Sequence, residues 1–266
     1  MNLVVYSKGM KKDWLTGIVL GVLVSSIILM VGMIWPELQA EIDTFKELLD
    51  SPIYEGLMGD LINLDFATFE GFIGMYVFIW LEYIIIFVSV FLGVNILSRE
   101  VDKRTIETSL SLPVPRWQYL LSKYMVFSSL MLAIPILSLG VSLGVALWLG
   151  EDIDLAKMGM ALFCSWLTLI TAAAIAMLCS TITLDSMKSY GLAGGVIVFM
   201  WVVERLGALV EVLDVFGKIS LFHYIQGGTV LRTGEVPLGD LAVVLVMLFL
   251  AVGGALVIFE RRDLAY

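Results

Sequence analysis

The stretch FIGMYVFIWLEYIIIFVSVFLGVNIL, residues 72–97, contains a single charged residue, Glu82. A helix of about 20 apolar residues is long enough to cross the bilayer's hydrocarbon core of roughly 30 Å. This stretch exceeds that length and has almost no charge, so it predicts a membrane-spanning helix.

The same length test finds further apolar runs along the chain. Together the six runs lie near residues 15–35, 72–97, 118–149, 158–180, 189–209 and 238–259. Hydrophobic side chains make up 60% of the 266 residues and the mean hydropathy is +0.97, above the roughly half apolar content of a soluble protein. We therefore predict an all-α integral membrane protein, a bundle of about six transmembrane helices. The run at 118–149 contains Pro135, which predicts a tilt or kink there and no additional span.

The charged residues predict the orientation of the bundle, although the net charge of -9 alone would suggest only an acidic surface. If the six runs are spans, all of the following basic residues fall on one side: Lys8, Lys11, Lys12, Arg99, Lys103, Arg104, Arg116, Lys188, Arg261 and Arg262. The opposite side receives acidic residues: Glu37, Glu41, Asp43, Glu47, Asp50, Glu55, Asp60, Asp65, Glu70, Glu151, Asp152 and Asp154. Short cytoplasmic loops carry an excess of Lys and Arg, so we expect both termini in the cytoplasm and a multi-pass protein of the cell membrane. Nucleic-acid binding is not expected.

Between and before the spans the sequence predicts few other elements. Residues 1–14 predict an N-terminal amphipathic helix that lies along the membrane, and residues 15–266 form one six-span domain. The domain has an outer loop at about 36–71, where apolar residues at helical spacing predict a short surface helix, and a cytoplasmic loop at about 98–117. Close helix packing is possible at two small-residue pairs, Gly17 with Gly21 and Gly140 with Gly144. Cys164 and Cys179 both lie within one apolar run and predict ordinary packing.

The loop and its flanks, residues 98–123, read SREVDKRTIETSLSLPVPRWQYLLSK. Two pairs of opposite charge stand four residues apart, Glu100 with Arg104 and Lys103 with Glu107. Such pairs meet on one side of a helix, and Pro113 would end that helix. The residues alone predict a short cytoplasmic helix joined to the next span, but by themselves they favour a simple topology signal of solvated ion pairs, because charged loops between spans are routine.

This loop resembles the signature of the type-2 ABC exporter permeases, in which an acidic residue, Thr-x-Glu, Leu-Ser-Leu-Pro-Val and Arg lead into the third span. The matching positions are Glu100, Thr105, Glu107, Leu110 to Val114, and Arg116. The ending FERRDL, residues 259–264, and the six-span plan are also similar to that family. One position departs from the pattern, because Arg104 stands where members often have Gly before the Thr.

The resemblance implies the membrane-spanning permease of an ATP-binding cassette transporter, an exporter, in which two permease chains, identical or paralogous, dock on two ATPase subunits. The loop helix would be the coupling helix, seated in a cleft of the ATPase, with the coupling residues Glu100, Lys103, Arg104, Thr105, Glu107 and Arg116. The chain has no Gly-x-x-x-x-Gly-Lys-Ser/Thr motif, so it is not expected to be an enzyme or to hold a cofactor by itself. ATP and Mg would be bound by the separate ATPase.

Polar residues within the spans are candidates for the transport pathway. Glu82 lies near the middle of the second span, where an ionised carboxylate costs several kcal/mol unless it is paired or hydrated. It must therefore face a polar group, either as a substrate or proton contact or as a structural hydrogen-bonded carboxylate. On the same ground we expect Glu82→Gln to insert normally. Glu204 and Arg205 end the fifth span near the outer surface, where we expect an interfacial ion pair and not a transport role. His223 is the only histidine, so neither a metal site nor a catalytic grouping is expected.

Two other functions remain alternatives. In an ion-coupled secondary transporter, Glu82 would be the coupling site and the two halves should show an inverted repeat, which the sequence does not display. A non-transporting membrane scaffold or assembly factor would anchor a soluble partner.

Overall fold

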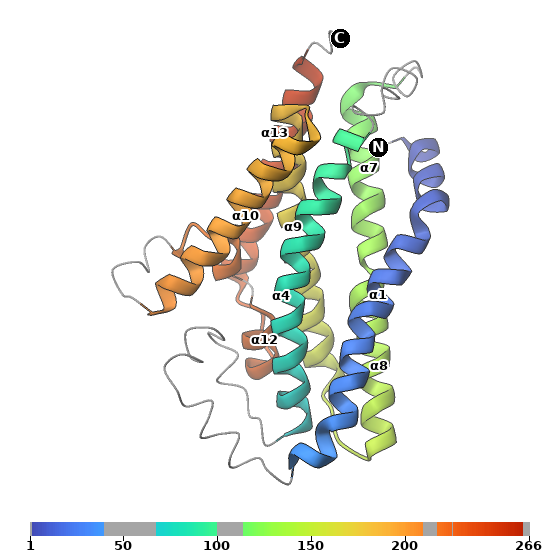
Figure 1. The fold of residues 1–266 in the computed structure, drawn as a ribbon, viewed down its shortest axis with the longest axis vertical. Coiled ribbons are helices and arrows are strands. Elements are labelled where there is room, and N and C mark those ends of the chain that lie inside the picture. The colour runs from blue at the N-terminus through green and yellow to red at the C-terminus, as the bar shows by residue number, and fades with distance from the viewer. Residues whose placement is uncertain (1, 40–67, 100–113, 210–216, 225, 263–266) are drawn as a thin grey trace.

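The computed structural model describes residues 2–39, 68–99, 114–209, 217–224 and 226–262, and within these ranges it is helical without strands (Figure 1). The elements are α1 (Leu3–Gln39), α4 (Phe69–Asn95), α7 (Arg116–Met131), α8 (Ala133–Leu149), α9 (Leu155–Thr183), α10 (Ser186–Leu209), the 3-10 turn η3 (Leu221–His223), α12 (Gly227–Thr233) and α13 (Leu238–Arg261). Six helical segments are long and apolar enough to cross a membrane, with α7 and α8 forming one of them. They coincide with the six predicted runs, which confirms the all-α membrane fold.

The charges separate along the bundle as predicted. We call the end at which Leu3 and Arg262 lie the upper end, as it is drawn in Figure 1. The described members of the basic set stand at helix ends on this side: Lys8, Lys11, Lys12, Arg99, Arg116, Lys188, Arg261 and Arg262. The described members of the acidic set stand at the lower end: Glu37, Glu70, Glu151, Asp152 and Asp154. The assignment of the upper end to the cytoplasm stays a prediction.

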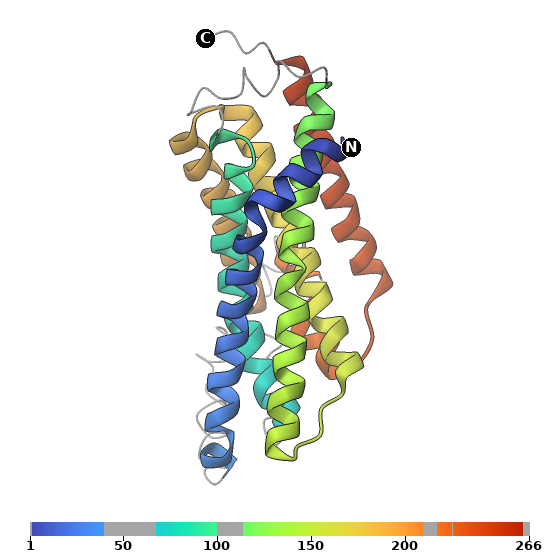
Figure 2. The ribbon, with the colours of Figure 1, turned by 90° about the vertical axis from the view of Figure 1, so that its right-hand side faces the viewer.

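The third span is broken where the sequence predicts a kink. Helix α7 ends at Met131, and α8 begins at Ala133, two residues before Pro135. Proline has no backbone N–H and so cannot donate to the carbonyl of Met131, four residues before it. At the break the N–H of Leu132 bonds to the carbonyl of Ser129, three residues before it, at 3.3 Å. The two helices nevertheless continue in the same direction, so the kink adds no span (Figure 2).

Residues 3–14 form the first part of α1, continuous with the first span. Figure 2 shows this part inclined to the rest of the helix. Two hydrogen bonds join this end of the chain to α7: the Asn2 backbone N–H, just before α1, donates to Ser122 Oγ at 2.7 Å, and the Tyr6 hydroxyl donates to Ser129 Oγ at 3.0 Å. Its position along a membrane surface stays a prediction.

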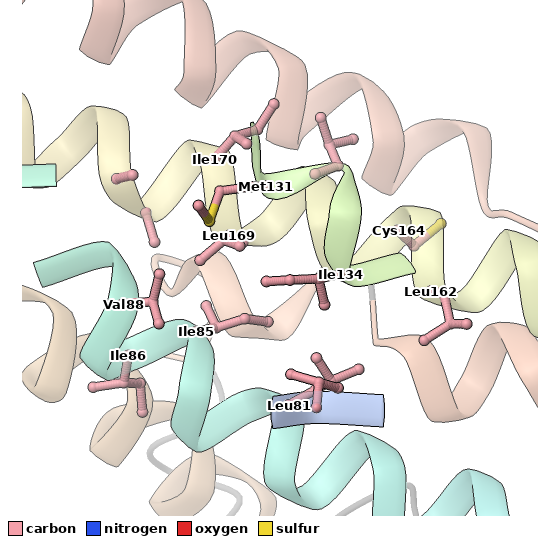
Figure 3. Close-up of a cluster of buried hydrophobic side chains, with 14 of the residues drawn as sticks. Leu81, Ile85, Ile86, Val88, Met131, Ile134, Leu162, Cys164, Leu169 and Ile170 are labelled. Carbon is pink, nitrogen blue, oxygen red and sulfur yellow. The ribbon is translucent and has the colours of Figure 1, made fainter. Parts of the chain in front are cut away.

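Helix α9 lies at the centre of the bundle and packs against α4, α8, α10, α12 and α13. Figure 3 shows the core, in which Leu169 of α9 is directed toward Met131 of α7 and Ile85 of α4, and Ile170 projects from the other side of α9. Cys164 is part of this core, and it and Cys179 are free and buried, as their predicted packing role requires.

The two predicted glycine pairs behave differently. A Cβ atom added at Gly17 would lie 2.5 Å from the Leu130 carbonyl oxygen of α7, and one at Gly21 would lie 2.9 Å from the Ala133 carbonyl oxygen of α8. Both glycines therefore allow close contact between helices, which confirms the prediction for this pair. Gly140 and Gly144 have no atom of a neighbouring element within 4 Å of such a Cβ, so this pair makes no helix contact within the described chain.

Between α10 and α13 the described residues include two short elements that the sequence analysis did not predict, η3 and α12. The turn η3 and helix α12 lie against α9, and α12 also contacts α4. Gly227 makes this contact possible, because a Cβ atom there would lie 2.5 Å from the Phe78 ring and 2.8 Å from Ser165 Oγ.

Candidate functional site

The structure brings polar groups together in two places that bear on function. The first is the upper junction, which we define as Arg116, Trp117, Thr181, Glu260 and Arg262. The second is the polar cluster within the spans, defined as Glu82, Glu204, Arg205, His223 and Gln226.

In the upper junction, the start of α7 is bonded to the end of α13. Arg116 Nη1 donates to the carbonyl oxygen of Arg262 at 2.7 Å, and the backbone N–H of Trp117 donates to Glu260 Oε2 at 3.0 Å. The first N–H groups of a helix have no partner within the helix, and the positive end of the helix dipole favours an anion. Glu260 of α13 therefore caps the helix into which the predicted coupling loop leads.

The same junction reaches the end of the central helix. The Arg262 guanidinium donates to the carbonyl oxygens of Thr181, at 2.7 Å, and of Ile182. The last carbonyls of a helix lack intrahelical partners and carry its negative dipole end, so a cation is favourable there. Three helices that are distant in sequence, α7, α9 and α13, are thus connected at one point.

Sequence analysis named Arg116 and the ending at 259–264 separately, and the structure joins them. The other predicted coupling residues, Glu100, Lys103, Arg104, Thr105 and Glu107, lie outside the described residues. The same holds for the predicted outer surface helix between residues 40 and 50.

In the polar cluster, Glu82 has the polar partner that its depth in the span requires. It is the central residue of α4, and Arg205 of α10 forms an ion pair with it through Nη2 and Oε2. The side chains are largely enclosed, with exposed fractions of 12% for Arg205 and 24% for Glu82. Removing one partner of a buried ion pair lowers the stability of a protein by about 3–5 kcal/mol, because the remaining charge stays uncompensated.

Glu204 points to a different set of partners. Its Oε2 lies 3.3 Å from His223 Nδ1, and its Oε1 accepts a hydrogen bond from Gln226 Nε2 at 3.1 Å. The prediction of a Glu204–Arg205 ion pair near the outer surface is therefore wrong. Adjacent residues of a helix do not face each other, and Arg205 pairs with Glu82 whereas Glu204 contacts His223 and Gln226. Arg205 meets the middle of α4, because the lower end of α10 stands beside the middle of the bundle (Figure 1).

A small cavity adjoins the polar cluster. Its volume is about 20 Å³, and its lining includes Glu82, Gln226, Ser165 and Thr168. That volume suits about one water molecule, which could bond to these polar side chains. The cluster can thus hold water or a proton-bearing group beside an ion pair inside the apolar bundle.

Sequence reasoning missed His223 and Gln226 as members of the cluster. Both stand in the segment between α10 and α13, whose short elements have no periodic apolar pattern over a useful length. The neighbouring Gly227 and Gly228 are the one local signal for close packing there. Among the described residues, no three His, Cys, Asp or Glu side chains gather where they could hold a metal ion.

The comparison with known families covers nearly the whole chain. The family model described as ABC-2 family transporter protein matches residues 9–264. No curated protein matches the chain. Membership of this family implies association with an ABC ATPase and with the membrane. The chain therefore belongs to the ABC-2 family of transporter proteins and is a non-catalytic, membrane-spanning subunit of an ABC transporter.

Proposed function

We propose that the chain is the permease of an ABC exporter, working as a pair of permease chains on two separate ATPase subunits that bind ATP and Mg. The observation that carries this proposal is the family match over residues 9–264, together with the upper junction that ties the predicted coupling loop to the bundle. The upper end carries the basic helix ends, so it faces the cytoplasm of the cell, where ATP is available.

The upper junction gives the loop a mechanical connection. Residues 98–117 follow α4 and return to the bundle at Arg116, which bonds to the end of α13. Arg262 in turn bonds to the end of α9, the central helix. A displacement of the loop by the ATPase would therefore move α7 directly and reach α13 and α9 through these hydrogen bonds.

The polar cluster is the proposed pathway element. The Glu82–Arg205 pair holds α4 against α10 inside the bundle. Charged groups at this depth are expensive and typically line a water-filled or substrate-bearing route. In this proposal, movement of α4 and α10 breaks or rotates the pair and exposes Glu82 to the transported compound.

Charge reversal at Glu107 tests the coupling proposal. Glu107→Lys places a cation one turn from Lys103, and at a docked interface a misplaced charge costs several kcal/mol. Every 1.4 kcal/mol corresponds to a tenfold change in binding, so we expect at least about tenfold less ATPase to co-purify with the tagged chain. The matched control is Asp152→Lys, an exposed carboxylate at the lower end, which should retain the ATPase.

The measurements are the amount of each variant in the membrane, the co-purified ATPase and the rate of ATP hydrolysis. Glu107→Lys should reach the membrane in normal amount but lose the co-purified ATPase and the ATP hydrolysis. If it keeps both at the wild-type level, the loop is not the coupling element. If the wild-type chain co-purifies with no ATPase, the scaffold alternative is favoured.

A further inference from the structure

An apolar groove lies on the surface between α1 and α4, in the upper half of the bundle. Its volume is about 540 Å³, and its walls include Leu15 and Val19 of α1 and Phe87 and Phe91 of α4, with Thr16 as the one polar side chain. The two phenylalanines are 74% and 61% exposed, although the Phe91 ring stacks on Tyr190 of α10 with 5.9 Å between ring centroids. The volume lies within the range of roughly 300–1,000 Å³ that is typical of ligand sites.

The level of the groove in the bilayer follows from its neighbours on α1. Trp14 directly precedes the groove and is 54% exposed. Tryptophan is enriched where the hydrocarbon meets the headgroups. The groove therefore begins just inside the hydrocarbon region, and its open side faces the lipid tails of the leaflet at the upper end.

Three lysines stand above the groove on the same helix. Lys12 precedes Thr16 by four residues and Lys8 precedes Leu15 by seven, spacings that place them on the groove's face of α1. Lys11 precedes Leu15 by four residues. All three side chains are exposed, and none has an ion pair within the described chain.

The nearest acidic residue on this helix does not neutralise the lysines on that face. Asp13 stands four residues from both Gly9 and Gly17, and these glycines contact Val126 and Leu130 of α7. Asp13 thus belongs to the side of α1 turned toward α7. Among the described residues, the groove face therefore combines an apolar slot with lysines at headgroup level that form no ion pair.

We propose that this site binds a phospholipid with an anionic headgroup, from the leaflet at the upper end. One acyl chain lies in the groove, and the headgroup phosphate and its added negative charge meet Lys8, Lys11 and Lys12. A zwitterionic lipid fits the groove equally well but has no net charge for the lysines. Each basic residue near an anionic headgroup increases the binding constant for the lipid about fivefold.

The test measures which lipids stay with the purified chain. The full chain is reconstituted in vesicles of equal parts phosphatidylglycerol and phosphatidylcholine, extracted in mild detergent and examined by native mass spectrometry. We expect phosphatidylglycerol to exceed phosphatidylcholine at least fivefold among the retained lipids. The Lys8→Gln, Lys11→Gln, Lys12→Gln triple variant should bring this ratio to that of the vesicles, and the corresponding Lys→Arg triple variant should keep the enrichment.

A matched control removes the same kind of charge elsewhere at the upper end. Lys188→Gln with Arg261→Gln should leave the enrichment unchanged. The groove itself is tested with Val19→Trp, which fills it and should reduce the retained lipid, whereas Leu250→Trp on the exposed side of α13 should not. Both positions are more than half exposed, so neither substitution disturbs the core.

Several outcomes would overturn the lipid site. One is a wild-type chain that retains the two lipids in the same ratio as the vesicles. Another is enrichment of phosphatidylglycerol that persists in the Lys→Gln triple variant. A third is an equal loss of enrichment in the Lys188→Gln, Arg261→Gln control. A second copy of the chain would be the occupant if Val19→Trp lowers the dimer fraction and leaves the retained lipid unchanged. None of these readouts depends on ATP hydrolysis or transport.

Discussion

At the scale of single residues, Glu82 shows how a charge is accommodated among apolar spans. The sequence requires a polar partner for it, and the structure supplies Arg205, 123 positions further along the chain. This partner changes the expectation for Glu82→Gln. The amide would leave the Arg205 guanidinium without its counter-charge inside the bundle, so the substitution is no longer expected to be harmless.

We predict that Glu82→Gln and Arg205→Met each destabilise the folded chain by about 3–5 kcal/mol, and that the double variant recovers most of this loss. The recovery is expected because the double variant leaves no unpaired charge. The stability of the two single variants and of the double variant is measured by thermal unfolding in detergent, as the fraction of protein that stays monodisperse after heating. Single variants as stable as the wild type would contradict a coupled ion pair.

The same double variant separates the two roles proposed for Glu82. Because the double variant is expected to be nearly as stable as the wild type, a fall in its transport would reflect the loss of a contact between Glu82 and the transported compound. Transport at the wild-type level would leave Glu82 with a structural role only.

At the scale of elements, the contact between α1 and the broken third span depends on glycine. We predict that Gly17→Ala destabilises the chain by about 1–3 kcal/mol, because its Cβ would lie 2.5 Å from a backbone oxygen that cannot move independently. Gly144→Ala is the matched control: nothing adjoins it, so it should not destabilise the chain, and the higher helix propensity of Ala should add up to about 1 kcal/mol of stability. Thermal unfolding in detergent compares the two, and equal effects would show that α1 does not approach α7 so closely.

At the scale of the whole molecule, the separation of basic and acidic helix ends predicts the topology. In intact cells, an impermeant thiol reagent should label Asp50→Cys and leave Lys103→Cys unlabelled until the membrane is opened. Cys164 and Cys179 are 2% and 6% exposed and should contribute no background, which the wild-type chain controls. Labelling of position 103 with protection of position 50 would invert the assignment.

The sequence by itself determined the number and position of the spans, the separation of charges and the break near Pro135. Each of these depends on a local property: the length of an apolar run, the residues that flank it, or a missing backbone N–H. The close contact at Gly17 and Gly21 could also be foreseen, because small residues four apart form one smooth strip on a helix. Gly140 and Gly144 show that the same spacing does not say whether a neighbour is present.

Only the tertiary structure decided which residues meet across helices. The pairing of Glu82 with Arg205, the bonds from Arg262 to α9 and the place of His223 beside Glu204 all join segments far apart in the chain. Hydropathy fixes how long a helix is but not its tilt or rotation, which packing against neighbouring helices sets. Arg205 was therefore expected at the outer surface and is found beside the middle of α4.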